Sequence, residues 1–152
     1  YARFDGETDE LFVVDASDGR QTSLGNVGRG PDHVLEWSPD GTRIAYADGG
    51  SVYAVEVDGG ERSLLADSFV DIIDIAWSPD GTQIAFIRRP PGPSASLYVI
   101  PAGGGAERKV TDLTLASANG RTTITWSPDV GCTSTFKPAF SFNTFATAVA
   151  VV

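Results

Sequence analysis

Short runs in which apolar and polar residues alternate recur along most of this chain, and turn residues separate them. Alternation with a period of two is typical of half-buried β-strands. No window of about 11 residues carries the apolar stripe of an amphipathic helix. The pattern therefore predicts an all-β chain. The expected strands cover residues 10–14, 33–37, 43–47, 51–57, 62–66, 71–77, 83–87, 96–102, 108–112 and 122–126.

One of these runs belongs to an internal repeat. The segment WSPDGTRIAY at 37–46 returns as WSPDGTQIAF at 77–86, and WSPD appears a third time from Trp126. The intervals between the three tryptophans are 40 and 49 residues. The longer interval contains an insertion, RRPPGPSAS at 88–96, which we expect to be a loop. A period near 40–45 with four strands per repeat is the spacing of a β-propeller blade.

Each repeat supplies the parts of one blade. The strand that ends in tryptophan is the inner strand, and a second, a third and an outer strand follow it. SPDGT forms the first turn, because proline presets φ, aspartate bonds its own backbone and glycine accepts a positive φ. The three tryptophans are expected to pack as blade core. The segment YARFD aligns with YADGG, so Tyr1 falls inside a second strand. Residues 1–129 thus predict three circularly shifted blades.

The repeated phrase WSPDGT-x-IA-[YF], followed by LYV and a DGG turn, resembles the TolB-like, WD-type β-propeller repeat of bacteria. The resemblance covers about residues 1–129. It implies a propeller fold and an exported, periplasmic or extracellular protein, and six blades are the number in that family. Similar repeats build the propeller domains of prolyl-oligopeptidase-like peptidases. The Asp-box of sialidases does not fit, because Asp40 and Gly41 follow Pro39 directly.

Three blades cannot close a ring, since propellers have at least four. An open stack leaves unpaired strand edges that invite pairing with another chain. Three arrangements would satisfy these edges. Two copies could join head to tail, the chain could belong to a longer propeller, or copies could add without closing and form a filament.

The tail over 130–152 departs from the repeats, with Lys137 as its one charge and an alternation typical of a strand. One interpretation is that it supplies the missing second and later strands of the third blade. A second is that it is a donor strand for a neighbouring subunit. A third is a misplaced or non-native tail. The donor interpretation would use Phe140, Phe142, Phe145, Val149 and Val151.

Charge narrows the classes of partner. The net charge of -9 argues against nucleic acid and anionic membranes, both of which need clustered lysine and arginine. No stretch has the roughly 20 apolar residues of a membrane helix. The chain starts at Tyr1 and contains no methionine, so we expect a processed product or an excerpt of a longer chain.

Candidate chemistry is sparse. Cys132 is the single cysteine and His33 the single histidine, so neither a disulfide nor a Cys/His zinc cluster is expected within the chain. Acidic turns of this kind could hold calcium, but the chain contains no EF-hand spacing. A G-x-S-x-G nucleophile elbow is missing. The glycines at 103–105 read as a hairpin turn, since no P-loop lysine follows them.

The inner strands and their loops carry the candidate binding residues. In a propeller these strands line the central channel, and its entrance is the usual ligand face. Acidic side chains there would hold a cation or attract a basic peptide, and two arginines would anchor a carboxylate. Ordinary solvated loop residues are the simpler interpretation. The residues are Asp32, His33, Glu36, Asp71, Asp74, Arg88 and Arg89.

These observations favour a non-catalytic β-propeller module for protein binding or assembly, without cofactor. A second copy or a longer chain would complete its blades. One alternative is a structural subunit of an extracellular filament, polymerised by strand donation from the tail. The other is the propeller domain of a prolyl-oligopeptidase-like peptidase.

Overall fold

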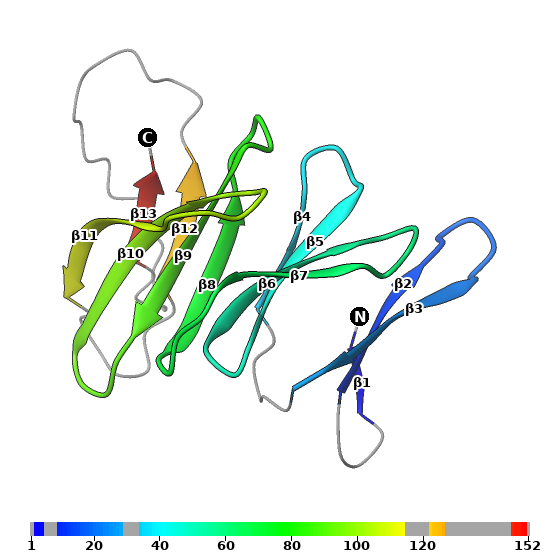
Figure 1. The fold of residues 1–152 in the computed structure, drawn as a ribbon, viewed down its shortest axis with the longest axis horizontal. Helices are drawn as coiled ribbons and strands as arrows, with labels where there is room; N and C mark the ends of the chain where they lie inside the picture. Colours follow the sequence, from blue (N-terminus) through cyan, green and yellow to red (C-terminus); the bar gives the residue numbers. More distant parts are fainter. Residues whose placement is uncertain (1, 5–8, 29–33, 115–121, 127–146, 152) are drawn as a thin grey trace, which may run out of the picture.

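The computed structural model describes residues 2–4, 9–28, 34–114, 122–126 and 147–151. These residues form thirteen strands and no helix (Figure 1). The strands are β1 Ala2–Phe4, β2 Asp9–Val14, β3 Gln21–Val27, β4 Leu35–Trp37, β5 Arg43–Asp48, β6 Ser51–Glu56, β7 Arg62–Ala66, β8 Asp71–Trp77, β9 Gln83–Arg89, β10 Ser94–Pro101, β11 Arg108–Thr114, β12 Thr122–Trp126 and β13 Thr147–Val151.

The described strands form a row of sheets, each of which we call a blade, and all of them are antiparallel except the pair of β12 and β13. Two blades are complete, with strand orders β4-β5-β6-β7 and β8-β9-β10-β11. The first sheet contains only β1-β2-β3, and β12 begins the last one. The predicted all-β propeller class, with three blades circularly shifted along the chain, is confirmed. Both complete blades start with the strand that ends in tryptophan.

A β-bulge fixes the correspondence between the blades. The extra residue lies in the outer strand, β3, β7 or β11, opposite the step from Leu11 to Phe12 in β2, from Val52 to Tyr53 in β6, and from Leu97 to Tyr98 in β10. These three strands therefore hold the same position in their sheets. Since β1 pairs antiparallel with β2, β1 is a second strand, as the alignment of YARFD predicts.

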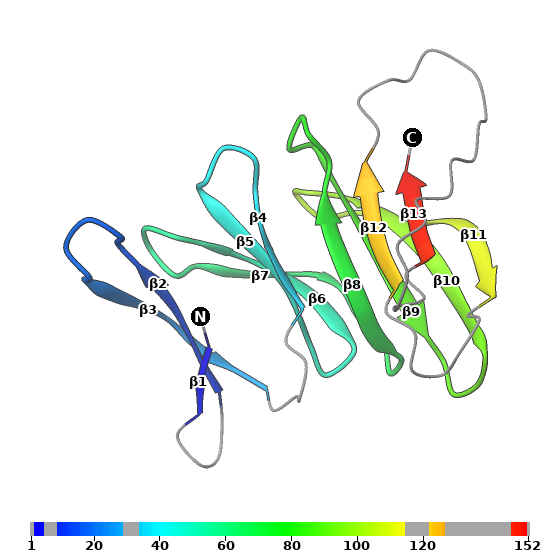
Figure 2. The ribbon, with the colours of Figure 1, turned by 180° about the vertical axis from the view of Figure 1, so that it is seen from behind.

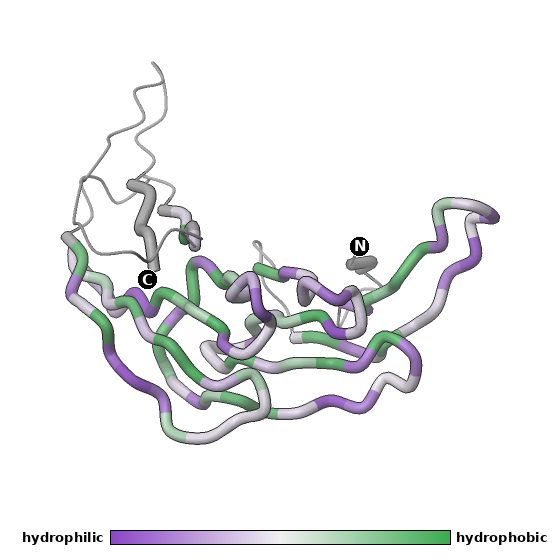
Figure 3. The backbone as a smooth tube through the Cα atoms, turned by 90° about the horizontal axis from the view of Figure 1, so that it is seen from above, coloured by the Kyte–Doolittle hydropathy of each residue, from purple (hydrophilic) through white to green (hydrophobic). Residues whose placement is uncertain are grey.

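Hydrophobic cores lie between neighbouring blades and not within one sheet. Leu11 and Val27 of the first sheet pack with Ile44 and Val55 of the next. A larger core joins the two complete blades, and a third joins the second of them to Ile124 of β12. Seen from above, hydrophobic stretches lie along the strands that face one another, whereas the tip of the β2–β3 hairpin is hydrophilic (Figure 3). Each blade is thus stabilised by its neighbour.

The tail differs from the first interpretation given above. A second strand in the complete blades runs antiparallel to its inner strand, but β13 pairs parallel with β12. Val149 lies opposite Ile124, and Val151 lies opposite Trp126. β13, the described part of the tail, therefore does not continue the last blade in the way that β5 and β9 continue theirs. Phe140, Phe142 and Phe145 lie outside the described residues.

Candidate interaction surfaces

The SPDGT turn closes the top of each complete blade through one carboxylate oxygen. Asp40 Oδ1 accepts hydrogen bonds from Ser38 Oγ (2.6 Å), Thr42 N (3.0 Å) and Thr42 Oγ1 (2.9 Å). Gly41 follows with a φ of 72°. The hydroxyl of Ser38 and then the two donors of Thr42 lower the pKa of Asp40 to about 2. This turn holds itself together, and its polar groups are already paired.

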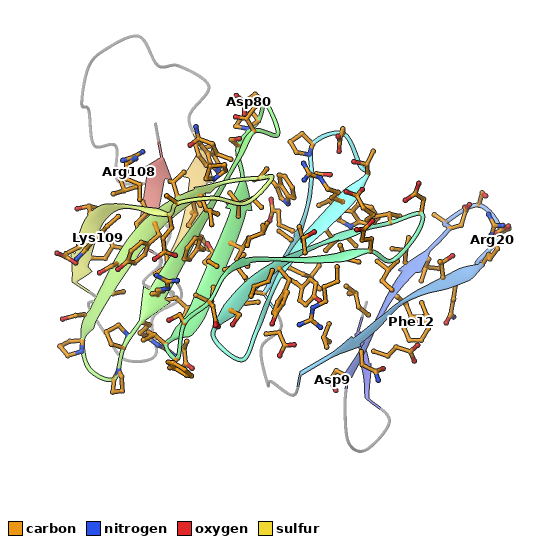
Figure 4. All side chains as sticks on the ribbon, in the orientation of Figure 1. Asp9, Phe12, Arg20, Asp80, Arg108 and Lys109 are labelled. Atoms are coloured by element: carbon orange, nitrogen blue, oxygen red, sulfur yellow. The ribbon has the colours of Figure 1, made fainter. Side chains whose placement is uncertain are left out.

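The second copy of the turn repeats the arrangement. Asp80 Oδ1 accepts from Ser78 Oγ, Thr82 N and Thr82 Oγ1 at 2.6, 3.0 and 2.9 Å. Hydrogen bonding by Ser78 and Thr82 again lowers the pKa of the carboxyl. Asp80 stands at the tip of the β8–β9 connection, away from the loops that lead into the inner strands (Figure 4). The repeated phrase therefore encodes a turn that is stabilised by its own hydrogen bonds.

The opposite end of the blades carries the predicted binding loops. The connection at 49–50 lies against 67–70, because a Cβ on Gly50 would meet Ser68 O at 2.6 Å and Val70 O at 3.0 Å. Arg88, next to the connection at 90–93, reaches Asp67 O at 3.5 Å. Loops between second and third strands therefore lie beside loops that enter inner strands. The sequence analysis places its candidate binding residues on these two kinds of loop and on the inner strands.

Two inner-strand carboxylates affect one another electrostatically. Glu36 in β4 and Asp74 in β8 stand at different distances from their tryptophans, so this effect does not follow from sequence offsets. Desolvation raises the pKa of Glu36, and repulsion from Asp74 adds to it. The Asp74 carboxylate also accepts a hydrogen bond from the backbone N–H of Ile124. Asp74 therefore links β8 to β12.

The other predicted residues divide into two groups. Asp71 is exposed and lies opposite Arg89 in the β8–β9 ladder, which places opposite charges side by side. Asp32 and His33 lie outside the described residues. Among the residues that the structure describes, no group of three or more His, Cys, Asp or Glu side chains could hold a metal ion. No described helix is long and apolar enough to cross a membrane.

Arg88 belongs to the interior of its own blade. The expected loop over 88–96 is shorter, because Arg88 and Ser96 are paired in the β9–β10 ladder and only 90–93 connect the strands. The guanidinium forms a two-pronged ion pair with Glu107, with one contact at 2.8 Å. It also covers the stacked rings of Phe86 and Tyr98, at 5.1 and 4.7 Å from their centroids. The guanidinium of Arg88 is therefore paired within its own blade, whereas the sequence analysis assigned it to a partner's carboxylate.

The preceding blade contains a related arrangement. Arg62 lies 3.6 Å from the Tyr53 centroid and 5.5 Å from that of Tyr46, and it pairs with Asp48 at 3.3 Å. Burial, against an opposing effect of Arg62, raises the pKa of Tyr46 to about 12. An arginine laid over an aromatic pair is therefore a structural device of these blades.

The tryptophans join inner strands of successive blades. Trp77 Nε1 donates to the backbone oxygen of Glu36 (3.1 Å), and Trp126 Nε1 donates to that of Ala76 (3.2 Å). Arg43 covers the Trp77 ring at 4.8 Å. Trp77 is 5% exposed, so the predicted core role is confirmed there. Trp37 is 45% exposed, which departs from that prediction.

Phe69 is a surface residue that the sequence analysis does not single out. It is fully exposed on the loop at 67–70, immediately before β8. Its place between an outer strand and an inner strand is the signal that identifies it, because a large apolar residue in a connecting loop has few neighbours. Phe69 therefore adds an apolar group to a loop face that otherwise carries charges.

Comparisons with known proteins support the architecture. No family model and no curated protein sequence matches the chain. Among solved structures, TolB from Acinetobacter baumannii is 19% identical, with a TM-score of 0.55 over 68% of this chain and 26% of that chain. Oligogalacturonate lyase from Vibrio parahaemolyticus is 13% identical, with a TM-score of 0.59 over 72% and 34%. Tricorn protease is 16% identical, with a TM-score of 0.57 over 72% and 11%.

These likenesses, together with the stacked four-stranded sheets, define the chain as a β-propeller module. The match to TolB agrees with the WSPDG repeats, and the blades have the TolB-like propeller fold. The chain spans between 11% and 34% of the length of the three chains named above. Their names include enzymes as well as TolB, so the likeness concerns the fold.

Proposed function

We propose that this chain is a non-catalytic β-propeller module that acts by protein association and is completed by strands from outside it. The completing strands come from a second copy or from the remainder of a longer chain. The observation that carries the proposal is the complementarity of the two end sheets. The first sheet holds a second, a third and an outer strand, and β12 is an inner strand.

Energetics favour such a completion. Edge strands present unpaired N–H and C=O groups, and pairing them removes an aggregation hazard. Completion would also cover Trp37, whose equivalent in the next blade is almost fully buried. Burial of apolar surface contributes about 25 cal/mol per Å², so an exposed tryptophan at a blade edge favours association.

Light scattering at several protein concentrations tests this proposal. The expected result is a species whose mass rises from 16.0 kDa toward twice that value. A folded chain that stays at 16.0 kDa at every concentration would contradict association of the chain with itself. Turnover of esters, peptides or polygalacturonate would contradict the non-catalytic role.

The filament hypothesis makes a different use of the tail. In the described residues β13 pairs with β12 of the same chain, so strand donation would require its release. An exported location, periplasmic or extracellular, is part of the proposal and is supported by the resemblance to TolB-like repeats. Fractionation of the source cells tests the location, and recovery in the cytoplasm would contradict it.

A further inference from the structure

The two indole hydrogen bonds follow one rule. Each tryptophan donates to the carbonyl of the residue that precedes the tryptophan of the preceding inner strand, as Trp77 does to Glu36 and Trp126 to Ala76. In the described residues no inner strand precedes β4, and Trp37 is 45% exposed. By the same rule, Trp37 requires a carbonyl equivalent to that of Thr125, the residue before Trp126.

The bulges show which edge is open. In each blade the second strand has one residue opposite the third-strand residue that precedes the bulge step. These pairs are Ala2 with Leu11, Ala47 with Val52, and Ile87 with Leu97. In the complete blades the other side of this second strand is occupied by an inner strand, β4 or β8. β1 is the edge of its sheet on that side. Among the strands that the structure describes, none takes in the first blade the place that β12 represents.

β12 is held in its inner position from one side. Trp126 and Ile124 both bond to β8, and the Ile124 side chain packs in the core that it shares with the second complete blade. β13 lies along β12 on the side on which β9 lies along β8, in both views of the ribbon (Figures 1 and 2). β13 thus occupies the place of a second strand but runs in the opposite direction to one.

We propose that β13 is a displaceable cap on β12, and that the strand which replaces it is β1 of a second copy of this chain. The exchange pairs β1 antiparallel with β12, and it brings the Thr125 carbonyl of one copy to the Trp37 indole of the other. Parallel pairing is slightly less stable per residue than antiparallel pairing, so the exchange favours the complete blade. This inference rests on the proposed function. It names the partner, a second copy of this chain, and the strand that regulates the pairing, β13.

The register of the new pair follows from the complete blades. Ala47 N donates to Val34 O at 3.0 Å, and Ile87 lies opposite Asp74. Val34 and Asp74 both stand three residues before their tryptophans, and the equivalent residue in β12 is Thr123. In the second copy Thr123 therefore lies opposite Ala2. Within one chain it lies opposite Ala148, so the two pairings exclude one another.

Release of the cap is tested with Val149→Pro in the full chain, because proline removes the backbone donor at the middle residue of β13 and fixes its φ. Val149→Ala is the matched control, since it keeps the backbone N–H. Val149→Pro is expected to lower the dissociation constant of the pair at least about tenfold, and Val149→Ala to leave it within about threefold. Sedimentation measures the constant, and iodide quenching of tryptophan fluorescence reports the burial of Trp37.

The register is tested by cross-linking. Because the β8–β9 ladder carries a bulge next to this position, the cysteines are placed at the Thr123–Ala2 pair itself. Thr123→Cys with Ala2→Cys, in a Cys132→Ser background, should form a covalent dimer on oxidation. Thr123→Cys with Arg20→Cys is the control, because Arg20 lies at the tip of the β2–β3 hairpin, away from β1 (Figure 4). Equal cross-linking in both variants would overturn the β1–β12 pairing.

The outcomes separate the two proposals. If the parent chain and Val149→Pro associate with the same constant, the cap is wrong and association stands. If both remain folded monomers at every concentration, self-association fails as well. If Val149→Pro associates while Trp37 stays accessible to iodide, the completing strand does not lie at the first blade and the inference is wrong.

Discussion

Single residues decide the local structure of the blades through paired polar groups. The aspartates of the two SPDGT turns each collect three donors within the turn. The sequence predicts this turn because proline, aspartate and glycine each have a known preference there. The sequence does not predict the position of Arg88. Arg88 and Arg89 open the segment RRPPGPSAS, and nothing in that polar, proline-rich segment shows that these two residues belong to strand β9.

The Asp40 turn predicts an acid-sensitive contribution to stability. A carboxyl whose folded pKa lies below its ordinary value of 3.8 stabilises the fold above that value, and the contribution is lost as pH falls toward about 2. An NMR titration of the Asp40 carboxyl should show a midpoint near 2. Thr42→Val, which removes one donor, should raise that midpoint. A midpoint at 3.8 or above in the parent chain would contradict the bonding described here.

Arg88 predicts a difference between two neighbouring arginines. Arg88→Lys loses the two-pronged contact with Glu107 and the planar cover over Phe86 and Tyr98. It should lower the free energy of unfolding by about 1–3 kcal/mol. Arg89→Lys is the matched control and should change it by less than about 0.5 kcal/mol. Urea denaturation measures both changes in unfolding free energy. Equal changes would contradict the packing of Arg88 against Phe86, Tyr98 and Glu107.

At the scale of elements, the strands follow from the alternation of apolar residues. β7, β8 and β12 occupy the expected residues 62–66, 71–77 and 122–126, and the other strands expected from the alternation differ by a few residues at their ends. The direction of β13 could not be predicted, because alternation is the same for a parallel and an antiparallel strand. The effect of Asp74 on the pKa of Glu36 was also hidden, since β8 carries a bulge between Ile72 and Asp74 that shifts its register.

The connection at 49–50 predicts a contrast between two glycines. Both have positive φ, 59° at Gly49 and 89° at Gly50. A Cβ at Gly49 meets nothing within 4 Å, whereas one at Gly50 meets the backbone of Ser68 and Val70. Gly49→Ala should cost about 1 kcal/mol and Gly50→Ala about 3 kcal/mol in unfolding free energy. Equal losses in thermal denaturation would mean that the two loops do not touch.

For the whole molecule, charge opposes the association that the blade edges favour. Each chain carries a net charge of -9, so two copies repel one another. Raising the salt from about 0.05 M to about 0.5 M shortens the Debye length and should tighten the pair. Sedimentation at both concentrations measures this. A pair that weakens with salt would indicate attraction between opposite charges as the main force.

The sequence predicts the stack of blades but not which strands pair with the open sheet edges at its two ends. The repeat predicts three circularly shifted blades, because the same tryptophan strand and turn are written twice and begun a third time. The identity of the completing strand depends on contacts between chains, which no pattern within one chain records. The exposure of Trp37, set beside the burial of Trp77, is the structural sign that the first blade needs another strand.

The indole N–H signals in a two-dimensional ¹H–¹⁵N NMR spectrum, followed as protein concentration rises, test this account most directly. Trp77 and Trp126 donate to carbonyl oxygens, so their N–H groups should exchange slowly at every concentration. The N–H of Trp37 should exchange rapidly in dilute solution and become protected as the chains associate. A Trp37 signal that remains unprotected while the mass doubles would contradict completion of the first blade by a second copy.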